Sequence, residues 1–183
     1  MRRVAPLALG LTLALVGGCR GDENKVVARL GGQEITQKEL EPVIEHFREE
    51  ARREGRQFPD EDTPSFRRSR NRLVALLVYR EELKQAARRL GVEVDEEQIS
   101  KRLEASGGGE EGEEGEEGEG DFARDSVEAQ LLYEGIYKNV TRNVKAPTSA
   151  ELSARRNRRM ADFVARLQRE TRVRYEPGYA PGS

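Results

Sequence analysis

The sequence predicts a mainly α-helical, bundle-like domain that is closed by a small antiparallel β-sheet. Apolar residues recur at helical spacing through most of the chain after residue 36. Short segments with alternating apolar residues occur only near the two ends, at 26–35 and 173–175. Capping residues and Gly or Pro breaks separate the helical segments. We therefore expect the N-terminal hairpin and the C-terminal strand to form one sheet beside the helices.

The composition argues against several functional classes. The 34 Asp and Glu residues nearly balance the 32 Lys and Arg residues, whereas dedicated nucleic-acid-binding proteins show a strong basic excess. Cys19 is the only cysteine and His46 the only histidine. One cysteine cannot form an intramolecular disulfide or a Cys-based zinc site. A histidine-rich metal site or a Ser/His/Asp triad would depend entirely on His46. We expect no metal, no cofactor and no nucleic-acid partner.

The first residues have the pattern of an export signal. Arg2 and Arg3 precede an uncharged, largely apolar stretch at 4–16, which is shorter than the ~20 residues that span a bilayer. The segment "LVGGC" ends at Cys19, and the sequence becomes polar directly afterwards. It resembles the lipobox of bacterial lipoproteins, in which cleavage before the cysteine accompanies attachment of a diacylglycerol to its sulfur. The resemblance implies an exported protein that is lipid-anchored to a membrane through Cys19. A plain secretory signal with an incidental cysteine is the alternative.

The hairpin and the first helix follow a short polar tether. Val26, Ala28 and Leu30 alternate with Val27 and Arg29 with a period of two, as in a strand, and Gly31-Gly32 suits a tight turn into a return strand. Thr36 and Glu39 have the spacing of a capping box, so a helix should begin there. Its expected apolar stripe is Leu40, Val43, Ile44 and Phe47. Pro42 lies within this helix and should kink it or delay its regular start.

Two further helices complete the first part of the domain. The longest is expected from about Ser65 to Leu90, with an apolar segment, "LVALLVY", in its middle and Gly91 as its C-cap. Asp95 and Gln98 predict the capped start of the next helix. The segment "GGGEEGEEGEEGEGD" then contains no apolar residue, so we predict a disordered, solvated linker at 107–121.

The second part of the domain contains two helices and a strand. One helix is expected from about Phe122 through Val144, ended by Ala146-Pro147. Thr148 and Glu151 predict the cap of the last helix, whose apolar positions are Met160, Phe163, Val164 and Leu167. The predicted organisation is a signal peptide at 1–18, a tether at 19–25, the domain at 26–106 and 122–176 around the linker at 107–121, and a tail at 177–183.

Three stretches carry a family likeness: "VVARLGGQEITQKELEPVIEHF", "RLVALLVYREELKQAARRLGVEVDEEQI" and "AQLLYEGIYKNVT". They resemble the N-terminal domain of SurA- and PrsA-type chaperones. The ending "VRYEPGYAP" is similar to the strand by which such chains close their domain. The likeness covers roughly Lys25 to Leu103 and Phe122 to Tyr179. It implies an exported protein that holds unfolded clients outside the cytoplasm. Because ATP is absent there, we expect it to act without ATP.

The sequence departs from the family pattern in two respects, and the first bears on catalysis. Many members carry a parvulin prolyl-isomerase domain after the helical core, but "NVKAPTSAEL" leads directly into the last helix here. The paired histidines of a parvulin site are also missing, and His46 is expected at the surface because it falls off the apolar stripe. We therefore expect no enzymatic activity. The acidic linker, which replaces an ordinary connection between helices, is the second departure.

The main functional prediction is a membrane-anchored, extracytoplasmic holdase-type chaperone for unfolded or newly exported proteins. A lipid-anchored scaffold for one specific envelope partner would account for the same helices. A prolyl-isomerase relative that has lost its catalytic domain is a further alternative. The candidate client-binding residues belong to the two most apolar helices, although each taken alone suits an ordinary core: Leu73, Leu76, Leu77, Tyr79, Leu131, Tyr133 and Tyr137.

Overall fold

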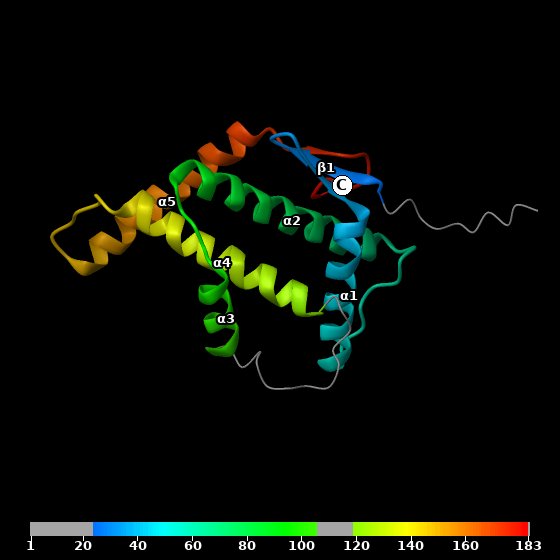
Figure 1. The fold of residues 1–183 in the computed structure, drawn as a ribbon. Helices are drawn as coiled ribbons and strands as arrows, with labels where there is room; N and C mark the ends of the chain where they lie inside the picture. Colours follow the sequence, from blue (N-terminus) through cyan, green and yellow to red (C-terminus); the bar gives the residue numbers. More distant parts are fainter. Residues whose placement is uncertain (1–23, 106–118, 183) are drawn as a thin grey trace, which may run out of the picture.

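The structure is a computed structural model, and it describes residues 24–105 and 119–182. Figure 1 shows helices packed beside a small sheet. The elements in chain order are β1 (Val26–Leu30), β2 (Gln33–Thr36), α1 (Gln37–Arg53), α2 (Pro64–Leu90), α3 (Glu96–Ala105), α4 (Glu119–Thr141), α5 (Ser149–Thr171) and β3 (Arg174–Tyr175). The predicted mainly helical class is confirmed. Cys19 and most of the acidic linker lie outside the described residues.

The sheet joins the two ends of the domain, as the sequence predicts. Its strand order is β2-β1-β3, and both neighbours of β1 are antiparallel to it. The hairpin turn uses Gly31 and Gly32, whose φ angles of 54° and 87° lie in the region that glycine adopts without steric cost. On the other side of β1, strand β3 pairs its Tyr175 with Ala28. A β-strand that follows the last helix therefore completes the sheet begun by the hairpin.

A β-bulge changes which residues of β1 are buried. The sequence predicts that Val27 and Ala28 face opposite sides of the sheet. The register with β2 instead shifts between Val26 and Ala28, and both Val27 and Ala28 are 0% exposed. A bulge adds a residue to one strand and breaks its simple alternation. The prediction of strict alternation is therefore wrong at this point.

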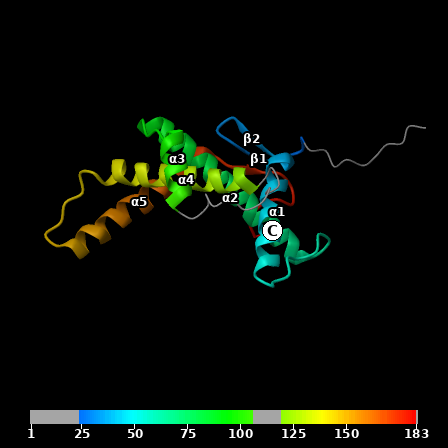
Figure 2. The same cartoon turned by 60° about the horizontal axis from the view of Figure 1, so that its bottom comes forward.

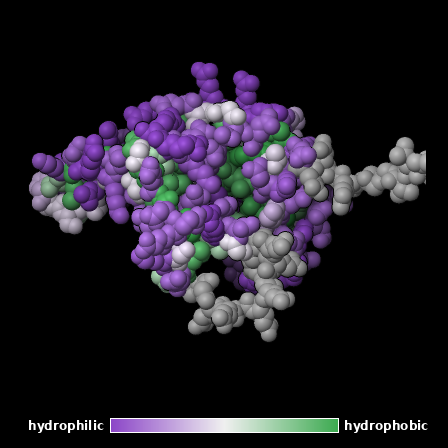
Figure 3. Space-filling view, in the orientation of Figure 1, coloured by the Kyte–Doolittle hydropathy of each residue, from purple (hydrophilic) through white to green (hydrophobic). Residues whose placement is uncertain are grey.

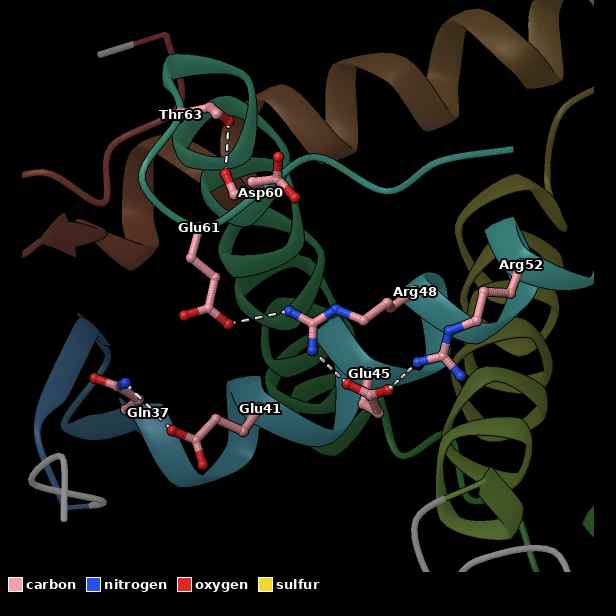
Figure 4. A network of polar contacts seen from close by, with 8 residues as sticks. All are labelled: Gln37, Glu41, Glu45, Arg48, Arg52, Asp60, Glu61 and Thr63. Carbon is pink, nitrogen blue, oxygen red and sulfur yellow. Dashed lines mark hydrogen bonds and ion pairs between the residues drawn. The ribbon is translucent and has the colours of Figure 1, made fainter. Parts of the chain in front are cut away.

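Helix α1 begins and continues as its capping signals indicate. The Thr36 backbone N–H donates to Glu39 Oε2 at 2.7 Å, which completes the predicted capping box. Pro42 lies inside the helix. Farther along, Glu45 accepts hydrogen bonds from Arg48 at 2.6 Å and Arg52 at 2.9 Å, and Arg48 also reaches Glu61 in the following loop (Figure 4).

At the other helix ends, the capping residues predict some boundaries correctly and miss others. Gly91 ends α2 in the left-handed conformation with φ 62°, and the Asp95 carboxylate accepts from the backbone N–H of Gln98 at 2.8 Å. Thr148 likewise accepts from the Glu151 backbone at 3.2 Å. Helix α4 differs from its prediction at both ends. It starts at Glu119, inside the predicted linker, and stops at Thr141 rather than Val144.

The core consists of two apolar clusters that α2 connects. The first joins the sheet, α1 and the first half of α2, and its fully buried members include Leu30, Leu40 and Val74. The second joins the end of α2 to α4 and α5, around Leu83 and Ile136. Figures 1 and 2 show α2 running through the molecule between these parts. The packing of α2 on both sides explains why its middle is apolar nearly all round.

The segment predicted to be a tail after residue 176 is partly packed. Tyr179 is 6% exposed and belongs to the first cluster. The Arg70 guanidinium lies 4.2 Å from the centre of its ring and donates to the Gly178 carbonyl at 2.6 Å. The buried Asn71 donates from Nδ2 to the Ala180 carbonyl at 2.9 Å. The domain therefore extends at least to Ala180.

Candidate functional site

The seven candidate residues separate into core positions and surface positions. Leu73 is buried in the first cluster, so the structure gives it a packing role. Leu131 is half-buried and lines a different pocket, beside α3. Tyr137 is half-buried and donates from its hydroxyl to Asn157 Oδ1 on α5, at 3.2 Å. Leu76, Tyr79 and Tyr133 are the candidates that share one pocket.

This α2–α4 pocket is a shallow apolar depression of about 320 Å³. Helix α2 contributes Leu76, Tyr79 and Leu83, and α4 contributes Ala129 and Tyr133. Polar groups occupy the remaining lining positions: Arg80, Ser126 and Gln130. Figure 3 shows hydrophobic surface gathered near the centre of the molecule and flanked by hydrophilic side chains. An apolar depression with few polar groups is typical of a binding site.

Two tyrosines give this pocket both apolar surface and polar tips. Tyr133 is 38% exposed, more than any other large hydrophobic residue in the described part of the chain. Burial, the nearby Tyr133 and the Glu82 carboxylate raise the pKa of the Tyr79 phenol above its ordinary value. Tyr79 therefore stays neutral at physiological pH and keeps its hydroxyl donor. Such side chains can cover an apolar ligand while donating a hydrogen bond.

Arg80 separates the α2–α4 pocket from a second one. It is only 7% exposed, its Nη2 donates to Ser126 Oγ at 2.6 Å, and its guanidinium lies 4.5 Å from the centre of the Phe122 ring. Its Nη1 lies 3.8 Å from Asp125 Oδ2 and has no hydrogen-bond partner. Burial lowers the pKa of Arg80 from its ordinary value, although Asp125 acts in the opposite direction. Arg80 thus fixes α4 against α2.

The second pocket, here called the junction pocket, measures about 300 Å³ and lies where β2, α1, α2 and α4 meet. Its apolar lining comes from Ile35, Pro42, Val43, Leu77 and Phe122. Acidic side chains outnumber basic ones around it: Glu34, Glu39, Glu81, Asp121 and Asp125 against Arg80 and Lys84. Leu76 and Leu77 therefore line two different pockets. Adjacent residues on a helix point about 100° apart, so the two side chains face different neighbours.

His46 is packed against Phe122 rather than exposed at the surface. The two rings are stacked with their centres 4.0 Å apart, and Phe47 meets Phe122 edge to face at 5.6 Å. His46 is half-buried, and its Nδ1 atom is buried without a hydrogen-bond partner. The prediction of a surface position is wrong because α4 covers this side of α1. Phe122, at the start of the predicted second part, was the residue that sequence reasoning missed.

The described residues provide no cluster of three or more His, Cys, Asp or Glu side chains that could hold a metal ion. Within the same ranges, none of the helices combines the length and the apolar character needed to cross a membrane. Two of the pockets, one apolar and one with an acidic rim, lie on the two sides of the buried Arg80.

Comparison with known proteins gave one finding. The family model of the SurA-like N-terminal domain matches residues 4–108, which is more than half of the chain. No curated protein and no solved structure matched. The matched range contains β1, β2, α1, α2 and α3 but ends before α4, which supplies half of the α2–α4 pocket.

Proposed function

Because the chain belongs to the SurA-like N-terminal domain family, we propose that it is a holdase-type chaperone that works without ATP. The family is chaperone-related. In this proposal the protein binds unfolded or newly exported proteins outside the cytoplasm, and a lipid on Cys19 anchors it to a membrane. The proposal includes no catalytic step and requires neither metal nor cofactor.

The α2–α4 pocket is the observation that carries the proposal. An unfolded chain exposes apolar side chains that a folded protein hides, and a pocket of about 320 Å³ can accept one or two of them. Fully burying one such side chain is worth about 1.5 to 3 kcal/mol. Single contacts of this size are weak and reversible, so a client can be released without ATP.

The junction pocket supports the same role with different chemistry. Its apolar floor and acidic rim favour aliphatic or basic side chains. Because Arg80 lines both pockets, an extended client segment that crosses it would meet the two sites in turn. Two weak sites joined through one ligand raise the overall affinity, because binding at the second becomes intramolecular.

Suppression of client aggregation tests the proposal. The chain from residue 19 onward, with Cys19→Ser to remove the thiol, keeps every described contact because these begin at residue 24. Added in equimolar amount to several chemically unfolded clients, it should lower their light scattering on dilution. A double variant, Leu76→Gln with Tyr133→Gln, should lose most of this effect because it makes the α2–α4 pocket polar.

Leu131→Gln is the matched control, because it places the same polar group on α4 at a half-buried position that faces another pocket. It should retain full suppression. Circular dichroism and urea unfolding must show that all variants remain folded. If the parent chain suppresses no client, the holdase proposal fails, and a single stoichiometric partner in pull-downs would then favour the scaffold.

A further inference from the structure

Charge is distributed unevenly over the molecule. Residues 138–174 contain eleven basic and three acidic side chains. The other described residues contain 18 basic and 23 acidic side chains. The near balance of the whole chain therefore hides a basic region, made of the end of α4, the connecting loop, α5 and the start of β3, on an otherwise acidic body.

The charge is densest in the basic elbow, defined as residues 138–159. One acidic residue, Glu151, accompanies seven cations there: Lys138, Arg142, Lys145, Arg155, Arg156, Arg158 and Arg159. Six of the seven are exposed, and Arg156 is half-buried. Within the described residues none of them forms an ion pair, whereas most arginines of α1 and α2 lie beside a carboxylate. The elbow therefore retains its positive charge for an external partner.

The elbow is a projecting and internally braced structure. Figures 1 and 2 show α4 and α5 meeting at the end of the molecule opposite α1. Arg155 donates to the Lys145 carbonyl at 3.0 Å, which ties α5 to the connecting loop. The Tyr137 hydroxyl bonds to Asn157 Oδ1 and holds the two helices together. The cations are therefore displayed on a convex, preorganised tip.

We propose that the basic elbow docks onto the surface of a bilayer containing anionic phospholipids. Its cations are spread around a convex tip, and a soft planar surface of phosphates can meet many of them without matching their shape. Single-stranded nucleic acid is bound by basic grooves with stacking aromatic rings, and residues 142–159 contain no aromatic side chain. Basic residues near an anionic bilayer each contribute roughly a fivefold gain in affinity at physiological salt.

The elbow would act as a second membrane attachment. Stable anchoring generally needs two signals, such as an acyl chain and a basic patch. The elbow and the start of β1 lie toward opposite ends of the molecule (Figure 1). Attachment at both ends would therefore hold the long axis of the molecule parallel to the membrane. This orientation depends on the lipid anchor of the proposed function. The contact between elbow and bilayer does not.

Vesicle binding by the Cys19→Ser chain from residue 19 tests the proposal. Sedimentation with vesicles of equal parts phosphatidylglycerol and phosphatidylcholine should show binding that weakens with added salt. Binding to pure phosphatidylcholine should be much weaker. The variant Arg142→Gln, Arg158→Gln, Arg159→Gln removes three exposed cations that form no hydrogen bond or ion pair within the described residues, and it should weaken anionic binding about 100-fold.

The matched control replaces three arginines at the start of α2, Arg67→Gln, Arg68→Gln and Arg72→Gln, all of them exposed. It changes the net charge equally but should lower vesicle binding less than about tenfold. Equal losses in both variants, or equal binding to neutral vesicles, would overturn the proposal. The membrane proposal would also be overturned if the elbow variant kept its affinity for vesicles but lost binding to polyglutamate. The partner of the elbow would then be an acidic protein. The elbow variant should still suppress client aggregation in the light-scattering assay, because its changes lie outside the α2–α4 pocket. A loss of vesicle binding with client holding intact therefore separates this proposal from the holdase proposal.

Discussion

Tyr179 shows how a residue near the chain end can support the core. Its ring is buried in the first apolar cluster, and the Arg70 guanidinium covers one of its faces. Asn71, almost fully buried, bonds to the adjacent Ala180 carbonyl. These contacts join the last described residues to the start of α2. They contribute apolar packing and satisfied polar groups at this end of the first cluster.

Replacing Tyr179 by alanine should therefore lower the free energy of unfolding by about 3 to 5 kcal/mol, the usual cost of removing a buried aromatic ring. Tyr133→Ala, which removes the same atoms from an exposed position, should cost about 1 kcal/mol or less. Urea unfolding followed by circular dichroism measures both. Similar losses in the two variants would contradict the packing role assigned to Tyr179.

The contacts of a side chain were least predictable where its partners come from distant parts of the chain. Ring contacts with His46 and the cation–π contact with Arg80 both depend on Phe122, which lies on another helix. The repetition of apolar residues along α1 cannot show which of its sides α4 will cover. The candidate list accordingly contained Leu76, Tyr79 and Tyr133 but also Leu73, which is core.

Helix boundaries were largely predictable because capping is local. Thr36, Gly91 and Thr148 satisfy backbone groups within a few residues of themselves, so the sequence contains the whole signal. The end of α4 was misplaced because Val144 continues the apolar spacing although the helix stops at Thr141. The bulge in β1 was missed for a similar reason, since it depends on pairing with β2.

The contact between α4 and the segment after α2 requires a small residue. A methyl group at Gly135 would lie 2.5 Å from Val92 Cγ1, closer than carbon atoms approach in folded proteins. Gly135 is a helical position at which alanine would otherwise be favoured by about 1 kcal/mol. Close packing, rather than backbone conformation, therefore explains this glycine.

Gly135→Ala should destabilise the protein by about 1 to 3 kcal/mol through overpacking. Introducing it into a Val92→Ala background should cost much less, because the clashing methyl groups are gone. A double-mutant cycle of unfolding free energies measures this coupling. Additive losses, or stabilisation by Gly135→Ala alone, would show that the two elements do not meet as described.

The whole molecule depends on residues outside the range that defines its family. The match ends at residue 108, yet β3, Phe122 and Tyr179 complete the sheet and the first apolar cluster. The second cluster consists mainly of α2, α4 and α5. Because the α2–α4 pocket spans both parts, we expect client binding to require the chain beyond the matched range.

Site-specific photo-crosslinking to an unfolded client tests whether clients bind in the α2–α4 pocket. A photoreactive phenylalanine analogue would replace Tyr133 in the α2–α4 pocket or Leu131 on the other side of the same helix. We expect strong crosslinking from position 133, which a second unfolded client should compete away, and little crosslinking from position 131. Equal crosslinking from both positions, or none from position 133 in a folded variant, would contradict client binding in this pocket.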